Sequence, residues 1–363
     1  MMGPACDKAP DTLSSAQPNQ RAFFGRDPHL AIFGAGAVGR SVAAWLAEAG
    51  LRVTLIARPD VATAIAQSGL RVRDVHSRAT RTIHLRTASR VAAEDRPDAL
   101  FLCVKTYALD EVGALLAEAR VPFVVALQNG VDNQQVLPRY FPKIAYAVVG
   151  YNAWLDESSG VLEYRNKGPL VIGTPDGSLG PECRELSALL TGRHAVATQY
   201  TDRFNDAAHT KMIINLANAF QALIGQPLRP VSDRRLAQIM LSRLLWEGVE
   251  IAKAAGYREH PIAGLPPWWL MYASVKLPTA LTRPAFDRAL AKMTISSMAQ
   301  DLLLRGGHAN ELESLNGRFI ELADRHHVAA PLNRGLYHLC KSRFGPDFVP
   351  MDVREVWAEI RAL

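Results

Sequence analysis

A loop of six residues near the start of the chain has the glycine spacing of a phosphate-binding turn. Its residues are Gly34, Ala35, Gly36, Ala37, Val38 and Gly39. An apolar run at 29–33 precedes the loop, a helical pattern at 40–49 follows it, and a β-branched run at 51–57 comes next. In this context the glycines permit a tight turn, admit a pyrophosphate close to the backbone and let the helix pack on the strand. The loop predicts a bound dinucleotide, and a turn without a ligand is the alternative.

The residue after the second predicted strand indicates which dinucleotide to expect. Sites for NAD usually place Asp or Glu there, where the carboxylate binds the ribose 2′-hydroxyl. This chain has Arg58, followed by Pro59. A guanidinium group suits a 2′-phosphate because it forms charge-assisted, bidentate hydrogen bonds. We expect NADPH, and the alternative is an arginine that only faces solvent.

Two further predicted strands end in polar residues. Lys105 follows the apolar run 99–104, and Asn129 lies in Gln128-Asn129-Gly130 after the run 123–127. Ligands of open α/β sheets lie beyond the carboxyl ends of the strands. We therefore expect Lys105 and Asn129 to face the nicotinamide or its ribose. For each of them a role in a helix cap or a turn is the alternative.

A helical pattern at 203–224 carries a polar stripe on an otherwise apolar circumference. At 100° per residue, Lys211, Asn215 and Asn218 fall within an arc of about 60°. An unpaired ammonium group is costly in a core, so the stripe should face a partner or a water-filled cleft. Burial lowers the pKa of a lysine, which suits Lys211 to protonate a ketone oxygen as hydride reaches the carbon. The alternative is a polar contact between helices, or an ammonium group that extends to the surface.

Two regions with different secondary-structure patterns must position these groups. Strand-like runs alternate with helical stretches at 70–73, 82–86, 99–104, 123–127 and 144–149. Further short runs, expected to close the far edge of the sheet, lie at 161–164, 170–173 and 195–199. After residue 201 the patterns are helical, at 203–224, 233–255, 283–304, 309–326 and 353–363. Between them, the Pro- and Trp-rich stretch Pro261–Pro284 predicts an irregular lid or partner surface.

This alternation predicts an α/β fold in which helices cover both faces of a mostly parallel sheet. We expect a flexible tail at 1–27, a Rossmann-like dinucleotide-binding domain at 28–201, and an all-helical substrate and catalytic domain at 202–363.

The composition limits the partners that we expect. Lys and Arg number 41 and Asp and Glu 35 among 363 residues, and the resulting charge of +6 is spread along the chain. Nucleic-acid binding is therefore not expected. Four widely spaced cysteines form no metal-binding pattern and favour the cytoplasm. No apolar stretch approaches the roughly 20 residues of a membrane span, and we expect neither a membrane partner nor a metal. A homodimer stays open.

Two segments near the C-terminus complete a set of motifs. One is Ser-Ser-Met-Ala-Gln-Asp at 296–301, and the other is Glu-Leu-Glu-Ser-Leu-Asn-Gly at 311–317. Together with the glycine loop, Val104-Lys105, Gln128-Asn129-Gly130 and the pair Lys211 and Asn215, their order and spacing resemble the ketopantoate reductase family. The resemblance extends from about residue 29 to the last predicted helix.

The resemblance implies NADPH-dependent reduction of a 2-keto acid to a 2-hydroxy acid, with ketopantoate as the leading substrate and a role in pantothenate synthesis. It implies that Lys211 is the general acid and that Glu311 orients groups at the reacting centre. Arg58 and Lys105 would contact cofactor phosphate or ribose, and Asn129 would lie between cofactor and substrate. By the same resemblance Asn215 and Ser297 bind substrate, and Asp301 has a supporting role.

The chain departs from the family pattern where substrate should bind. The family has a second Asn eight residues after the lysine, whereas this chain has Ala219 there, with Asn218 beside it. The stretches 302–310 and 261–284 also look enlarged. A reductase for another branched or larger 2-keto acid is therefore an open alternative. Two further readings are an opine-type or 3-hydroxy acid dehydrogenase and a non-catalytic NADPH sensor.

Overall fold

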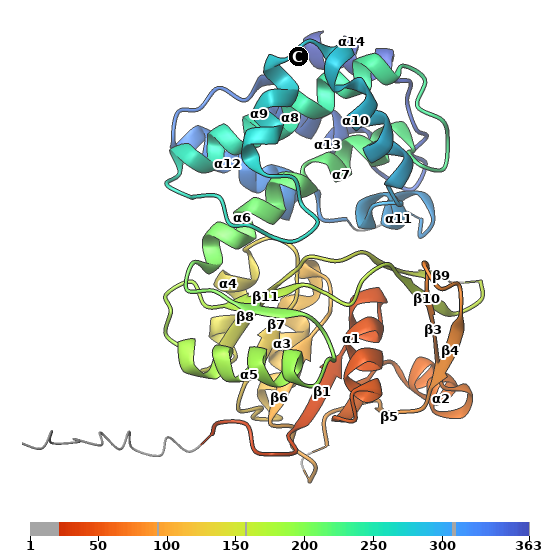
Figure 1. The fold of residues 1–363 in the computed structure, drawn as a ribbon, viewed down its shortest axis with the longest axis vertical. Coiled ribbons are helices and arrows are strands. Elements are labelled where there is room, and N and C mark those ends of the chain that lie inside the picture. The colour runs from red at the N-terminus through yellow and green to blue at the C-terminus, as the bar shows by residue number, and fades with distance from the viewer. Residues whose placement is uncertain (1–21, 93, 157, 307–309, 363) are drawn as a thin grey trace, which may run out of the picture.

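The computed structural model describes residues 22–92, 94–156, 158–306 and 310–362. Its elements fall into a sheet region below and a helical region above in Figure 1, with α6 (Phe204–Asn215) between them. The change from strands to helices occurs between Tyr200 and Phe204. The expected α/β fold class is confirmed.

An eight-stranded sheet forms the base of the first region. In spatial order its strands are β12 (Thr198–Tyr200), β11 (Leu170–Gly173), β8 (Ile144–Val149), β7 (Val124–Ala126), β6 (Ala99–Leu102), β1 (His29–Phe33), β2 (Arg52–Ile56) and β5 (Arg86–Ala88). The pair of β8 and β11 is antiparallel, and the other neighbours are parallel. From β1 the chain proceeds to β2 and β5 on one side, whereas β6, β7 and β8 lie on the other. The strand order therefore reverses between β1 and β6, where open α/β sheets bind ligands.

Alternate residues of the central strands enter two separate cores. Leu100 and Leu102 pack with Leu109 of α3 (Leu109–Ala117) on one face, while Phe101 packs with Trp45 of α1 (Ala37–Glu48) on the other. This alternation follows from the two-residue period of a strand whose sheet is covered on both sides. The remaining helices of this region are α2 (Pro59–Ser68), α4 (Asn133–Val136), α5 (Gly180–Gly192) and the 3-10 turns η1 (Thr106–Ala108) and η2 (Leu137–Arg139).

A second, four-stranded sheet corrects part of the prediction. Its order is β4 (Thr80–Ile83), β3 (Leu70–Asp74), β10 (Val161–Tyr164) and β9 (Ala153–Asp156). The run at 161–164, expected at the far edge of the main sheet, pairs here with β3 and β9. Tyr164 packs on Trp45 of α1 at a ring distance of 5.2 Å, so this sheet covers an apolar side of that helix. The predicted strand 82–86 is divided between β4 and β5, one in each sheet.

The second region is helical, as expected, but its helices are divided differently. Besides α6 it contains α7 (Ala217–Ile224), α8 (Arg234–Ala254), α9 (Trp268–Lys276), α10 (Thr279–Lys292), α11 (Ser297–Leu303), the π-helix η3 (Glu313–Gly317), α12 (Arg318–Arg325), α13 (Pro331–Arg343) and α14 (Val353–Ala362). The stretch Pro261–Pro284, expected to be irregular, contains α9 and the start of α10. Helix α13 was not predicted.

The predicted helix 203–224 is interrupted at Leu216. The side-chain amide of Asn316 donates to the Leu216 carbonyl oxygen at 3.3 Å, and Leu216 N–H reaches the carbonyls of both Met212 and Ile213. A side chain that occupies a helical carbonyl competes with the regular backbone ladder. The contact comes from 100 residues further along the chain, so a local pattern could not indicate it.

The expected tail ends earlier than residue 27. Phe24 is buried against Phe123, and the backbone N–H groups of Phe23 and Phe24 donate to Glu185. The remainder of the predicted tail, 1–21, lies outside the described residues. Among the described helices, none is long and apolar enough to cross a membrane. In the same part of the chain no cluster of His, Cys, Asp and Glu could hold a metal ion.

Candidate active site

The glycine loop lies at the point where the strand order reverses, and its three glycines have different surroundings. Gly34 adopts φ +105°, and a Cβ atom there would lie 3.1 Å from the backbone of Cys103 after β6. A Cβ atom on Gly39 would lie 1.8 Å from the Gly34 carbonyl oxygen. A Cβ atom on Gly36, in contrast, would meet no heavy atom within 4 Å beyond its chain neighbours. Gly34 and Gly39 thus hold the loop together, whereas Gly36 borders open space.

The start of α1 fits the phosphates of a dinucleotide. Gly36 caps the helix without a side-chain hydrogen bond, so the first N–H groups keep their donors free of any capping side chain. Arg40 Nε donates to the Ala35 carbonyl oxygen at 2.8 Å and fastens the loop from inside the helix. Arg58 lies at the end of β2, is exposed, and precedes α2. These residues fit the phosphates of a dinucleotide, with Arg58 beyond the carboxyl end of β2.

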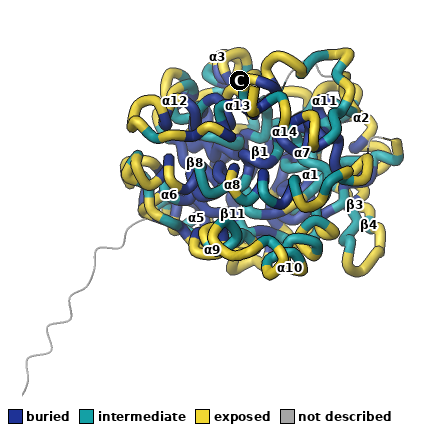
Figure 2. Tube along the Cα trace, turned by 90° about the horizontal axis from the view of Figure 1, so that it is seen from above, coloured by how far each residue is buried: buried dark blue, intermediate teal, exposed yellow. Residues whose placement is uncertain are grey.

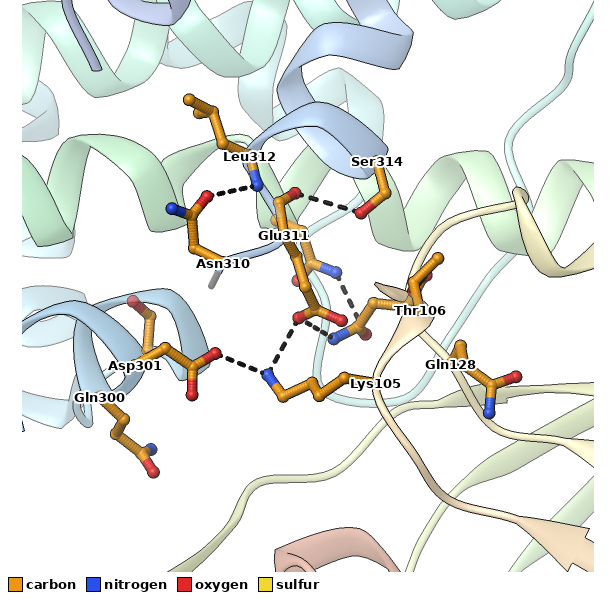
Figure 3. A network of polar contacts seen from close by, with 12 residues as sticks. Lys105, Thr106, Gln128, Gln300, Asp301, Asn310, Glu311, Leu312 and Ser314 are labelled. Carbon is orange, nitrogen blue, oxygen red and sulfur yellow. Dashed lines mark hydrogen bonds and ion pairs between the residues drawn. The ribbon is translucent and has the colours of Figure 1, made fainter. Parts of the chain in front are cut away.

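Five polar side chains from both regions form one connected network (Figure 3). Lys105 Nζ, at the end of β6, donates to Asp301 Oδ2 on α11 at 2.9 Å and to Glu311 Oε2 at 3.3 Å. The Asn129 amide, at the end of β7, donates to the same Glu311 oxygen at 3.5 Å. Asn215 on α6 in turn donates to Asn129 Oδ1 at 3.4 Å. Residues that are far apart in the sequence thus meet beyond the strand ends.

The charges in this network largely compensate one another. The side chains of Asp301 and Glu311 are only 7% and 3% exposed, and Lys105 lies between them. Burial lowers the pKa of Lys105, but the carboxylates of Glu311 and Asp301 outweigh that effect and raise it above its usual value. Lys105 is therefore a permanent cation in this arrangement, with both carboxylates as its partners. Arg305 supplies a second cation to Asp301, at 2.9 Å.

A cavity of about 690 Å³ opens beside the network. Val38 of the glycine loop and Asn129 line it from the sheet region. From the helical region it is lined by the three residues of the predicted polar stripe, and also by Ser297. The stripe residues are Lys211, Asn215 and Asn218. The cavity therefore joins the residues expected at the nicotinamide to those expected at the substrate.

Lys211 differs electrostatically from Lys105. It is half-buried, and its side chain has no hydrogen bond or ion pair to another residue in the described part of the chain. Burial alone lowers the pKa of its amine from 10.5 to about 8. A lysine with this pKa is mostly protonated at neutral pH and gives up its proton more readily than an exposed lysine does. It lies one helical turn from Asn215, which the network fixes.

The structure separates the predicted residues into three groups. Asn129, Lys211, Asn215, Asn218 and Ser297 line the cavity, as does Val38. Lys105 and Glu311 contact each other beside it, and Arg58 lies apart from them at the end of β2. Gln128 has a structural contact, because its amide nitrogen donates to the carbonyls of Leu102 and Val104 and ties β7 to β6.

The sequence analysis placed the stretch 261–284 where substrate should bind, but it did not predict that α9 and α10 form walls of the cavity. Trp269 and Phe286 line it, together with other apolar residues of the two helices. The Trp268-Trp269 pair was the available signal, but the two residues differ: Trp268 is 5% exposed and Trp269 is 67% exposed. Asn129–Asn215 is another contact that no local pattern indicated.

Comparisons with known proteins match both regions. Residues 30–177 match the family described as "Ketopantoate reductase PanE/ApbA", and residues 203–343 match "Ketopantoate reductase PanE/ApbA C terminal". The chain is 27% identical over 319 residues to the 2-dehydropantoate 2-reductase of Archaeoglobus fulgidus, a match that covers 87% of this chain and 98% of the relative.

Solved structures show the same architecture. A PanE/ApbA family ketopantoate reductase from Ralstonia eutropha JMP134 superposes with a TM-score of 0.65 at 26% identity, covering 92% of this chain and 99% of the other. D-mandelate dehydrogenase, solved with NADH and anilino(oxo)acetate, shares the fold at 19% identity with a TM-score of 0.69, covering 86% and 97%. The two family matches together span most of the chain, the first over the glycine loop and the second over Lys211. The chain belongs to the ketopantoate reductase family of oxidoreductases.

Proposed function

We propose that this protein uses NADPH to reduce a 2-keto acid to the 2-hydroxy acid, with ketopantoate, the substrate of the family's reaction in pantothenate biosynthesis, as the reference substrate. The single observation that carries the proposal is the position of Lys211, which shares one cavity with Val38 and Asn129 of the dinucleotide-binding region. The three described cysteines are free thiols, which supports a reducing compartment such as the cytoplasm.

The proposed roles come from the family resemblance, and the positions of the polar groups support them. NADPH, when bound, supplies the hydride to the ketone carbon. The π electrons of the carbonyl then move to oxygen, which takes the proton from the Lys211 ammonium group. Asn215 and Ser297 bind the substrate, Asn129 lies between substrate and cofactor, and Glu311 holds Asn129 and Lys105 in position. Lys105 and Arg58 contact the cofactor.

Removal of Lys211 tests the proposal. Lys211→Ala should lower kcat for reduction of a 2-keto acid by about 10²–10⁴, the usual effect of losing a general acid. Absorbance of the reduced nicotinamide follows the reaction. The control is Lys167→Ala, which removes a partly exposed lysine paired with Glu48 and should leave kcat unchanged.

The pH dependence supplies a second readout. The pKa of Lys211 in the ligand-free protein is about 8, so kcat/KM of the wild type should fall as pH rises through that value and the proton donor is lost. Lys211→Ala should retain weak activity without this descending limb. Full turnover in Lys211→Ala would refute the assignment of the general acid. An absence of any NADPH oxidation with 2-keto acids would refute the proposed reaction.

A further inference from the structure

The lining of the cavity changes character from one element to another. The strand ends, α6 and α11 contribute polar groups, among them Asn129, Lys211 and Ser297. Most of the residues that α9, α10 and the turn between them contribute are apolar, including Trp269, Leu270, Leu277, Phe286 and Leu290. Binding sites combine apolar walls with a few convergent polar groups in this way. The apolar wall is therefore a separate subsite next to the proposed reacting centre.

Helix α10 presents one face to this subsite. The lining residues that lie within the helix are Thr282, Ala285, Phe286, Ala289, Leu290 and, at its C-terminal end, Lys292. At 100° per residue these positions fall within about 160° of the circumference, which is one face of the helix. None of the 14 residues of α10 is fully buried, and Figure 2 draws the helix in teal and yellow. Its inner face borders the cavity and lacks the cover that a core gives.

Large apolar residues are unusually exposed along this wall. In the described chain ten large apolar side chains are exposed, and five of them lie within residues 269–281. Three of those five also line the cavity: Trp269 is 67%, Leu270 is 43% and Leu277 is 48% exposed. Such clusters usually mark a binding surface, because apolar area in water is unfavourable. Their place in the cavity lining indicates a ligand that enters it.

We propose that this subsite receives the side chain of the substrate, and that the preferred 2-keto acid carries an apolar, aromatic or branched group larger than that of ketopantoate. This inference rests on the proposed function. The side chain of ketopantoate has only two methyl groups and a hydroxyl, so most of the apolar wall formed by the two helices would stay exposed to water when ketopantoate is bound. A larger apolar group covers the wall while its keto acid end remains beside Lys211 and Ser297.

The experiment compares three 2-keto acids: pyruvate, ketopantoate and phenylpyruvate. We expect kcat/KM for phenylpyruvate to exceed that for ketopantoate by at least about tenfold, the range that a few added carbons give in an apolar pocket. Ala289→Phe places a ring on the inner face of α10. It should lower kcat/KM for phenylpyruvate at least about tenfold relative to pyruvate.

A matched control comes from the same helix. Ala291 is also exposed but lies on the opposite face of α10, away from the cavity lining. Ala291→Phe makes the same exchange and should leave the ratio between substrates unchanged. A ratio equally altered in Ala289→Phe and Ala291→Phe, or a wild type that prefers ketopantoate over phenylpyruvate, would overturn the inference while the proposed reaction stands.

Binding distinguishes this failure from that of the proposed function. Phenylpyruvate cannot react with the oxidised cofactor, so calorimetry on the protein with NADP⁺ reports affinity alone. Tighter binding of phenylpyruvate than of ketopantoate, weakened by Ala289→Phe, would support the subsite even if no acid were reduced. Equal affinities would overturn it. If Trp269→Ala changed the oligomeric state but not the substrate preference, a second copy of the chain would be the occupant and the inference would be wrong.

Discussion

Lys105 Nζ lies 2.9 Å from Asp301 Oδ2, and this contact joins the end of β6 to α11 across 196 residues of sequence. The same ammonium group lies 3.3 Å from Glu311. Two carboxylates with little exposure thus share one cation that the sheet region supplies. The pairing connects the sheet region to the helical region beyond the carboxyl ends of the strands.

Replacing this cation should be costly. Lys105→Met should lower the free energy of unfolding at pH 7 by about 2–4 kcal/mol, because it leaves poorly solvated carboxylates without Lys105. The pKa of Lys105 is raised in the folded state, so its contribution is complete below the unfolded pKa of about 10.4 and declines as pH rises through the folded value. Urea unfolding at pH 7 and above pH 10 measures both effects.

Lys167→Met serves as the control for this prediction. It removes a partner of Glu48 in a pair whose side chains are 36% and 23% exposed, and should cost less than about 1 kcal/mol. Equal losses in the free energy of unfolding for the two variants would show that the Lys105 ion pairs contribute no more to stability than the Lys167–Glu48 pair does.

Lys211 should have the opposite effect on stability. Its pKa of about 8 is below the 10.5 of an unperturbed lysine, so the unfolded state binds more protons between these values and stability rises with pH in that window. Lys211→Met should therefore raise the free energy of unfolding of the ligand-free protein at pH 7 by about 1–3 kcal/mol. This difference from wild type should decrease as the pH approaches 10. Unfolding curves of both proteins at several pH values test this. A variant less stable than wild type at pH 7 would contradict the prediction.

The glycine loop should separate folding from cofactor binding. Gly39→Ala brings a Cβ atom within 1.8 Å of the Gly34 carbonyl oxygen and should destabilise the protein by more than about 2 kcal/mol. Gly36→Ala points into open space and should change stability by no more than about 1 kcal/mol. The dinucleotide should fill that space, so Gly36→Ala should weaken NADPH binding at least about tenfold. Thermal unfolding and a fluorescence titration with NADPH distinguish the two; undiminished NADPH affinity in Gly36→Ala would place the cofactor elsewhere.

Arg58 should decide the choice of cofactor. Arg58→Ala removes the cation at the end of β2 and should raise KM for NADPH about tenfold or more, the value of a hydrogen bond to a charged group, while KM for NADH stays constant. Arg235→Ala is the control, since Arg235 is exposed on α8 in the helical region. Parallel changes with NADPH and NADH would mean that Arg58 does not contact a 2′-phosphate.

Local patterns predicted the elements that carry the cofactor loop. The apolar run before Gly34, the helix after it and the ends of β6 and β7 lie close to where periodicity places them, because each depends on neighbours in sequence. The polar stripe could also be predicted from the sequence, because the helical period places Lys211, Asn215 and Asn218 on one face. All three line the cavity.

Other features depend on partners far away in the sequence and could not be predicted from local patterns. Asn316 interrupts the helix at Leu216, and β10 pairs with β3 rather than with the main sheet. The Lys105–Asp301 ion pair also requires the folded chain, because nothing near either residue specifies the other. Helix α9 was hidden by the prolines that flank it, although Pro267 is well placed before a first helical turn.

The π-helix η3 makes the position of Glu311 depend on the exact number of residues between 313 and 317. A π turn accommodates one residue more than an α turn, and such turns are read as single insertions into an ordinary helix. Deleting Ser314 would restore regular winding and rotate the preceding residues by about 100°, which carries the Glu311 carboxylate away from Lys105 and Asn129. A variant or relative without this extra residue would therefore need another group to balance the charge of Lys105.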